Sequence, residues 1–192
     1  MTPLPDTLLE AVASAAVREG LADAVFTRLA SPIGRLLVVQ GPEGIVRVGF
    51  EDEPEDAALA SVARALGPRI VASDRELAGT RDALSAYLEG DDDRLELPVD
   101  LRLVGAPFRR AVLETLHDEV PRGETVTYGA LAARSGRPRA FRAAATACAR
   151  NPVPIVVPCH RVLPAGGGIG NYGGGVARKR ALLRLEGSLP RG

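Results

Sequence analysis

The sequence predicts an α+β protein in which a small antiparallel-sheet domain precedes a helical domain. Residues 25–50 carry short apolar runs separated by turn residues, as in neighbouring strands. From residue 106 onward, apolar residues recur at helical spacing instead. The chain of 192 residues is long enough for one large or two small domains with a real core. We therefore expect a helical extension over residues 1–25, a sheet domain over 26–100 and a second domain over 101–192.

Turn sequences order the elements of the first half. Ser31-Pro32-Ile33-Gly34 and Gly41-Pro42-Glu43-Gly44 separate three apolar runs, which predicts an antiparallel meander of three strands. The elements expected here, in order, are a helix from Asp6 to about Ala24, strands over 25–30, 35–40 and 45–50, a helix over 54–66, a short strand over 69–72, a helix over 73–88 and an extended connector over 95–101.

The second half begins with a helix predicted over residues 106–117. Two shorter helices are expected over 128–134 and 139–149, joined by the tight turn Ser135-Gly136-Arg137-Pro138 in the shape of a helix-turn-helix. The second of these is rich in alanine, and we expect Cys148 on it to be a buried packing residue. A face with so little bulk suits either a narrow partner such as a DNA minor groove or tight packing within the protein.

Opposite charges are separated along the chain although the net charge is zero. Residues 1–100 hold 19 acidic and 9 basic side chains, whereas residues 101–192 hold 5 acidic and 15 basic ones. From Arg122 to Arg161 there are seven arginines and a single acid, Glu124. Such a block is typical of a surface that binds phosphates. A solvated basic face neutralised by the acidic half explains the charge equally well.

Composition excludes several classes of protein. Apolar residues make up 46% and charged residues 25% of the chain, as in ordinary globular proteins. We expect no membrane span and no signal peptide, because no apolar run approaches about 18 residues and the first residues lack basic and apolar regions. Two cysteines indicate a reducing, cytoplasmic location. Cys148, Cys159, His117 and His160 lack the spacing of zinc ligands, so we expect no metal.

The segment Pro158-Cys159-His160-Arg161-Val162 carries the clearest chemical signal. It follows the apolar residues 155–157, so we expect the thiol at the end of a buried strand. An adjacent imidazole can help a thiol to ionise and become a nucleophile. The alternative is a structural cysteine packed beside a surface histidine. A GxGxxG pattern over residues 168–173 lacks an accompanying βαβ unit, which argues against a dinucleotide site.

An ordered series of segments extends this signal over the second half. Its members are Tyr128-Gly129-Ala130-Leu131-Ala132, Arg142, residues 151–162 around Cys159, residues 170–175, Lys179 and residues 182–187. The series is dense over about residues 104–187 and resembles the O6-alkylguanine-DNA alkyltransferases. Ser31-Pro32-Ile33-Gly34 and the strands after it resemble the amino-terminal domain of that family, which implies a ribonuclease-H-like fold there.

The resemblance implies an irreversible, single-turnover transfer, the methylated-DNA–protein-cysteine S-methyltransferase activity. That family draws the damaged base out of double-stranded DNA from the minor-groove side and moves the alkyl group of O6-alkylguanine, and of O4-alkylthymine, onto a cysteine. Cys159 would be that cysteine, His160 the base that deprotonates it through a water, and Glu186 the group that orients the imidazole. A monomer that binds duplex DNA is further implied, with cooperative binding left open and no cofactor.

Other residues are implied to bind the base or the DNA. Tyr128 would contact the flipped base, Arg142 would fill the gap left in the duplex, and Asn151 would hold the turn before the active site. The remaining members of this set are Pro154, Tyr172 and Gly173 at the alkyl pocket, and Thr127, Ala143 and Arg137 at the DNA surface. Without the resemblance, Arg142 is a phosphate contact, Tyr128 an ordinary residue at a helix start, and Glu186 a surface acid.

Two departures from the family pattern concern how the protein enters DNA and which alkyl groups it accepts. Phe141 occupies a place where the family commonly has a small residue, directly before the inserting arginine, which bears on how deeply the helix enters DNA. Gly173 lacks a side chain that some relatives carry, so larger alkyl groups would fit. Two other functions stay open: a lesion-binding protein without transfer, which would lack the nucleophile, and a Cys-His hydrolase acting on acyl groups.

Overall fold

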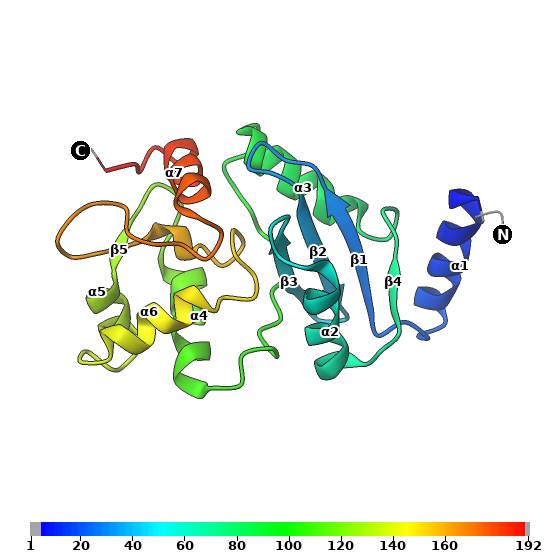
Figure 1. Ribbon diagram of the computed structural model, residues 1–192, viewed down its shortest axis with the longest axis horizontal. Coiled ribbons are helices and arrows are strands. Elements are labelled where there is room, and N and C mark those ends of the chain that lie inside the picture. Colours follow the sequence, from blue (N-terminus) through cyan, green and yellow to red (C-terminus); the bar gives the residue numbers. More distant parts are fainter. Residues whose placement is uncertain (1–4, 191–192) are drawn as a thin grey trace.

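The computed structural model describes residues 5–190, which form a sheet lobe and a helical lobe (Figure 1). In the sheet lobe, β1 (Ala24–Leu29), β2 (Leu36–Gly41) and β3 (Gly44–Phe50) form the predicted antiparallel meander. The short strand β4 (Ile70–Ala72) pairs in parallel with β1, so the strand order is β3-β2-β1-β4. The fold class predicted from the sequence is confirmed.

Both faces of this sheet are buried, because alternate residues of β2 enter different cores. Leu36 and Val38 belong to the core that contains α3 (Ala78–Glu89), whereas the residues between and after them pack with α2 (Glu55–Leu66). A run of apolar residues without alternation is the pattern of a strand that is covered on both sides. The core on the α3 side continues into the helical lobe.

Two helices of the sheet lobe are shorter than predicted. α1 (Asp6–Arg18) ends early because Gly20 takes a positive φ of 66°, a helix-ending conformation that glycine adopts readily. α3 begins later than predicted, since the Ser73 hydroxyl accepts the Glu76 amide at 3.1 Å and closes a turn there instead. α1 lies at the end of the sheet lobe farthest from the helical lobe (Figure 1).

The helical lobe contains α4 (Pro107–Glu119), α5 (Tyr128–Arg134), α6 (Phe141–Ala149), α7 (Val176–Leu185) and a short parallel pair of strands, β5 (Val126–Thr127) and β6 (Val162–Leu163). α5 and α6 pack against each other and on α4, in the predicted helix-turn-helix arrangement. α5 begins at its predicted residue, where the Thr127 hydroxyl accepts the Ala130 amide at 3.2 Å and caps the helix. None of the helices in residues 5–190 combines the length and the apolar composition that a membrane crossing needs.

Residues 155 and 156 form a buried turn and Val157 makes an isolated bridge with Pro154, so the strand predicted there was wrong. Prolines at positions 152, 154 and 158 carry no amide hydrogen and cannot continue a sheet ladder. The Asn151 side chain takes over by donating to the Val157 carbonyl at 2.8 Å and accepting the Val153 amide at 3.0 Å. Cys159 therefore opens a short 3-10 helix, η1 (Cys159–Arg161), rather than ending a strand.

Several contacts hold the two lobes together close to Cys159. The Val48 amide of β3 donates to the Pro152 carbonyl at 2.8 Å. The ring of Phe50, at the end of β3, meets the ring of Tyr172 edge-on, with 6.1 Å between their centroids. The sheet lobe therefore forms one side of the region around the cysteine.

The turn between β2 and β3 packs closely against the connector at Pro98, and this contact can be tested. Gly44 has a φ of 144°, and an added Cβ would lie 2.5 Å from the Pro98 carbonyl oxygen. We predict that Gly44→Ala lowers the free energy of unfolding by about 1–3 kcal/mol, since backbone strain and a backbone clash coincide. Gly79→Ala on α3 is the matched control: nothing lies within 4 Å of its Cβ, and we expect a gain of up to about 1 kcal/mol. Urea unfolding measures both, and equal stability of Gly44→Ala and the parent protein would contradict the close contact.

Candidate active site

Cys159 lies at the base of a cavity of about 510 Å³ in the helical lobe. The walls come from the start of α5, the second half of α6 and the glycine-rich loop over residues 164–173. Three residues that the sequence predicted for the site, Tyr128, Tyr172 and Gly173, line this cavity together with the thiol. The volume falls within the range of about 300–1,000 Å³ that ligand pockets occupy.

The Cys159 thiol is buried, with 4% of the residue exposed. Burial raises the pKa of this thiol, because a thiolate is poorly solvated in the interior. Three neighbours lower that pKa: the Asn151 amide, which donates to the sulfur at 3.1 Å, the charge of Lys179 and the Tyr172 hydroxyl. Burial outweighs them, so the resting residue is a thiol and needs a base in order to react.

The His160 ring is fully buried, and burial lowers its pKa, so it is a neutral imidazole near pH 7. Its Nε2 atom lies 2.7 Å from Glu186 Oε1. An ionised carboxylate can only accept, so we assign the ring proton to Nε2, which leaves a lone pair on Nδ1. Nδ1 is buried and has no hydrogen-bond partner within residues 5–190. Such a lone pair can take a proton from a thiol directly or through one water.

The Glu186 carboxylate is buried among donors and is not a surface acid. The Arg161 guanidinium donates to both of its oxygens, at 3.0 and 3.1 Å, and the Tyr87 hydroxyl donates to Oε1. Burial by itself raises the pKa of Glu186, but the hydrogen bonds from His160 and Arg161 outweigh it and lower that pKa to about 2. Glu186 is therefore ionised at neutral pH and holds the His160 ring in one orientation.

Tyr87 and Arg161 belong to this site although the sequence did not predict them for it. The sequence grouped Arg161 with the phosphate-binding arginines, which was wrong: the residue is 8% exposed and also donates to the Val120 carbonyl at 2.5 Å. Its position directly after the Cys-His pair was the available signal. Tyr87 comes from α3 of the sheet lobe and is 1% exposed. Nothing in the sequence connects it with Glu186, 99 positions later.

Lys179 is buried behind the active-site segment. Its Nζ donates to the Val162 carbonyl at 2.7 Å and to the Asn171 carbonyl at 3.4 Å. Burial lowers the pKa of this amine, whereas the nearby thiol of Cys159 acts in the opposite direction. The side chain therefore ties β6 to the glycine-rich loop and places a positive charge close to the site where a thiolate would form.

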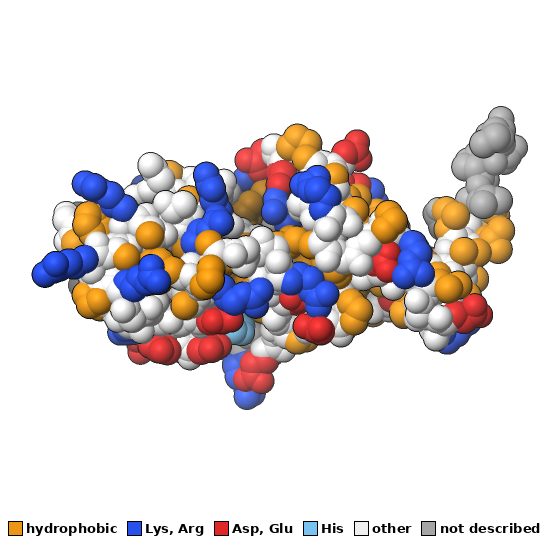
Figure 2. Space-filling model, turned by 90° about the horizontal axis from the view of Figure 1, so that it is seen from below, with side chains coloured by type: hydrophobic (Ala, Val, Ile, Leu, Met, Phe, Trp, Pro, Cys, Tyr) orange, Lys and Arg blue, Asp and Glu red, His pale blue; other side chains and the backbone are white. Residues whose placement is uncertain are grey.

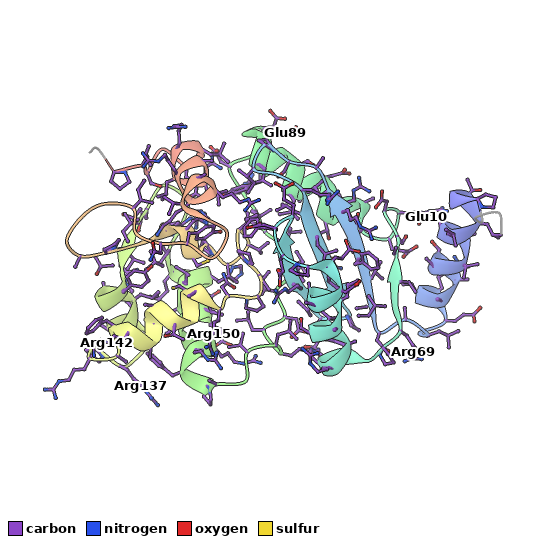
Figure 3. All side chains as sticks on the ribbon, viewed as in Figure 1. Glu10, Arg69, Glu89, Arg137, Arg142 and Arg150 are labelled. Atoms are coloured by element: carbon purple, nitrogen blue, oxygen red, sulfur yellow. The ribbon has the colours of Figure 1, made fainter. Side chains whose placement is uncertain are left out.

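The basic residues predicted at the DNA surface lie on an exposed edge of the helical lobe. Arg142 and Arg137 lie at the lower left of the helical lobe in Figure 3, and Arg150 lies farther right, at the other end of α6; all three are exposed. Seen from below in Figure 2, basic side chains are spread over the left half, where the helical lobe lies. The Arg142 guanidinium stacks over the ring of Phe141, 5.5 Å from its centroid, and 49% of Phe141 is exposed. An arginine and an aromatic ring thus project together from the start of α6.

α6 uses its alanines on two faces. Ala144 and Ala147 are buried where α6 packs on α4 and α5. Ala143 is exposed next to Arg142, so little bulk covers this part of the surface. Cys148 is buried as predicted, and it also lines the cavity described above. The alanine-rich sequence of α6 was interpreted either as tight packing within the protein or as a surface for close approach of a partner. The buried side fits the first interpretation and the exposed side fits the second.

Comparisons with known proteins match both lobes. A family model described as 6-O-methylguanine DNA methyltransferase, DNA binding domain, matches residues 107–188, and one described as its ribonuclease-like domain matches residues 24–101. The methylated-DNA–protein-cysteine methyltransferase of Haemophilus influenzae is 34% identical over 163 residues, which cover 84% of this chain and 85% of that protein. The Mycolicibacterium paratuberculosis protein of the same name is 45% identical over 112 residues, covering 58% of this chain and 66% of its own length. A crystal structure of Mycobacterium tuberculosis OGT in complex with DNA matches with a TM-score of 0.73 and 34% identity, over 85% of this chain and 93% of that one.

A buried thiol, a neutral histidine and an anchored carboxylate lie beside a basic helix-turn-helix, an arrangement that can activate a cysteine as a nucleophile. The matches over both lobes make this more specific, and the chain belongs to the 6-O-methylguanine DNA methyltransferase family. The ribonuclease-like domain expected in the first half is confirmed. In the sequence alignments the chain covers between 61% and 66% of the length of its mycobacterial relatives.

We predict that Tyr87→Phe raises the pKa of His160. Loss of the hydroxyl removes one donor from Glu186, so the carboxylate attracts a proton on His160 more strongly. NMR titration of the imidazole signals measures this pKa, and His117, the other histidine of the chain, reports any general change in the protein. The free energy of unfolding should fall by about 1–3 kcal/mol, because a buried carboxylate loses a partner. A folded variant with the parent pKa at His160 would show that Tyr87 does not act on the histidine.

Proposed function

We propose that this protein repairs double-stranded DNA by transferring the alkyl group of O6-alkylguanine, and of O4-alkylthymine, to Cys159. The transfer is irreversible and each molecule acts once, as a methylated-DNA–protein-cysteine S-methyltransferase. The observation that carries the proposal is the buried thiol at the base of a cavity, followed in the chain by a neutral His160 whose Nδ1 lacks a partner within residues 5–190. Family membership, the names of the relatives and the DNA complex of the mycobacterial neighbour support it.

Residues of the chain can carry each proton of the reaction. His160 Nδ1 takes the thiol proton through a water, and Glu186 stabilises the imidazolium that forms. The Cys159 thiolate attacks the alkyl carbon, and the bond from that carbon to O6 breaks with its electron pair passing to guanine. Burial raises the pKa of Tyr128 to about 12, so its hydroxyl stays protonated and can donate to the departing base. The thioether is stable, so the cysteine is not regenerated.

Base flipping delivers the lesion, because the O6 atom of a stacked guanine cannot reach a buried thiol. Arg142 enters from the minor groove and fills the space that the base leaves, and the exposed Ala143 lets α6 approach closely. Phe141, stacked beneath Arg142, adds an aromatic surface at the same point. The other proposed contacts are Arg137 and Thr127 to the DNA backbone, Asn151 to the turn before the thiol, and Pro154, Tyr172 and Gly173 around the alkyl group.

This transfer accounts for more of the molecule than the two alternatives. A lesion-binding protein without transfer has no use for His160 as a base oriented by Glu186, a carboxylate that Arg161 holds in place. A Cys-His hydrolase needs donors for an oxyanion and leaves the exposed Arg142 and the alanine surface of α6 without a role. We further propose that the protein acts in the cytoplasm as a monomer without a cofactor.

Incubation with a duplex that carries O6-methylguanine should add one methyl group to Cys159. We expect mass spectrometry of the Cys159 peptide to show the adduct, with loss of the lesion limited to one equivalent per protein. The Cys148 peptide should remain unmodified, because burial and the nearby Cys159 raise the pKa of that thiol. Cys159→Ser should lose the adduct and keep DNA binding. Tight binding without an adduct would exclude the transfer, and repeated turnover of an ester would favour the hydrolase.

Arg142→Ala should slow transfer from duplex DNA about tenfold or more, even at saturating DNA. Without Arg142, no side chain fills the space that the flipped base leaves in the duplex, so the flipped-out conformation is less stable. The variant should react with the free base O6-methylguanine at the parent rate, since its thiol is untouched. Arg150→Ala is the matched control, an exposed arginine beyond the end of α6. It should weaken DNA affinity in a salt-dependent way and leave the rate at saturation nearly unchanged. Single-turnover kinetics separate the two effects, and a parent rate for Arg142→Ala at saturation would exclude the insertion role.

A further inference from the structure

We propose that Phe141 is a second inserting residue, and that its ring stacks on the base opposite the lesion. Flipping of the damaged nucleotide leaves that base without a pairing partner. This inference rests on the proposed transfer to Cys159 and adds a specificity-determining contact with the DNA. It differs from the role given to Arg142, because it makes repair depend on the strand that carries no lesion.

Phe141 is packed differently from the other phenylalanines of the chain, all four of which lie within the described residues 5–190. Phe26, Phe50 and Phe108 are partly buried against the two hydrophobic cores, and Phe141 belongs to neither. With 49% of the residue exposed, an aromatic surface stays open at the first residue of α6. Single exposed apolar residues are common in proteins, so the surroundings of this ring decide its meaning.

The surroundings of Phe141 are basic. Arg139 and Arg142 are exposed on either side of it in the chain, and the sequence contains no acidic residue over positions 125–185. A protein partner with an apolar groove would have to desolvate these arginines without compensation. DNA phosphates pair with arginines and release counterions when they do so. The chemistry around the ring therefore favours a nucleic acid as the partner.

The ring accompanies the residue that is proposed to enter the duplex. The Arg142 guanidinium lies over the Phe141 ring, 5.5 Å from its centroid, so the two side chains form a layered pair. The neighbouring Ala140 and Ala143 have too little bulk to hold the ring away from DNA. If Arg142 occupies the space that the lesion leaves, Phe141 reaches the same depth of the minor groove.

A flat aromatic ring suits an unpaired base better than it suits the backbone of the duplex. Every base has a π face, and proteins that hold unpaired nucleotides gain affinity by stacking bases on aromatic side chains. Proteins that enter the minor groove also insert phenylalanine between base steps. The base opposite the lesion loses its hydrogen bonds and part of its stacking on flipping. It therefore has the most to gain from the Phe141 ring.

The test compares two duplexes, with O6-methylguanine placed opposite cytosine or opposite an abasic site. With cytosine, Phe141→Ala should lower the single-turnover rate constant at saturating DNA roughly five- to thirtyfold, the effect of one lost base–aromatic stacking contact. With the abasic site there is no base to stack, and the variant should react as fast as the parent protein does on that duplex. An equal loss of rate on both duplexes would overturn the stacking role.

A second comparison separates stacking from mere support of Arg142. If Phe141 only held the guanidinium in place, its removal would have no further effect once the guanidinium is gone. We expect Phe141→Ala combined with Arg142→Ala to be slower on the cytosine duplex than Arg142→Ala alone by about threefold or more. Phe141→Trp keeps a planar face and should retain the parent rate within about twofold, whereas Phe141→Leu should resemble Phe141→Ala. Equal rates for the double variant and Arg142→Ala would overturn the proposal.

Leu21→Ala is the matched control for loss of an exposed apolar side chain. Leu21 is 51% exposed and follows α1, which lies at the far end of the sheet lobe (Figure 1), so both rate constants should equal those of the parent protein. Every variant should react with the free base O6-methylguanine at the parent rate, because Cys159 is untouched. A parent rate for Phe141→Ala on the cytosine duplex, with a normal methyl adduct in the parent protein, would overturn this inference alone. Absence of the adduct in the parent protein would overturn the proposed function as well.

Discussion

The buried carboxylate of Glu186 is the group on which the geometry of the site depends. A carboxylate taken out of water costs several kcal/mol unless donors surround it. Here they come from two distant parts of the chain, Tyr87 on α3 and the pair His160 and Arg161 in η1, while Glu186 itself follows α7. α3, η1 and the end of α7 must therefore all be in place before the Glu186 carboxylate has its hydrogen-bond donors. The sheet lobe is part of the active site for this reason, although it contributes no group that would touch the reacting atoms.

Ionised Glu186 also determines the chemistry of its neighbours. Because it accepts from Nε2, the free lone pair of His160 lies on Nδ1. Burial keeps that ring neutral, and burial keeps Cys159 protonated, so the resting pair is an uncharged thiol with an uncharged base. A pair of this kind avoids an unpaired buried charge while the cavity is empty. The positive charge of Lys179 favours the thiolate at the moment it forms.

The sequence predicted the elements that have a periodic pattern and failed where side chains replace the backbone ladder. The apolar runs and turns of the first half predicted β1 to β3, and α5 begins where expected because Thr127 caps it. The apolar residues 155–157 have the composition of a strand, yet the prolines around them remove the donors that a strand requires. Asn151 supplies the substitute hydrogen bonds, a role that the family resemblance implied and that apolar periodicity does not reveal.

The site was predictable only as far as its chemistry is local in sequence. Cys159, His160 and Tyr128 stand in short motifs, and the structure brings Cys159 and Tyr128 to one cavity with His160 directly following the thiol. Arg161 was assigned to the surface because a count of charges does not reveal burial. Tyr87 could not be predicted, since its contact with Glu186 exists only after α3 and α7 have packed. Polar contacts between distant segments are set by tertiary packing, which periodicity does not describe.

A net charge of zero does not argue against a polyanionic partner, because the charges of this chain are separated between its halves. Residues 101–192 hold 15 basic and 5 acidic side chains, and the arginines Arg137, Arg142 and Arg150 lie on one exposed edge of that half. Charges are screened over about 8 Å at physiological ionic strength, so at contact only the nearest surface matters. As a polyanion approaches to within that distance, attraction of the helical lobe and repulsion of the acidic sheet lobe would together turn that edge toward its phosphates. A molecule with the same net charge and evenly mixed side chains would approach without a preferred orientation.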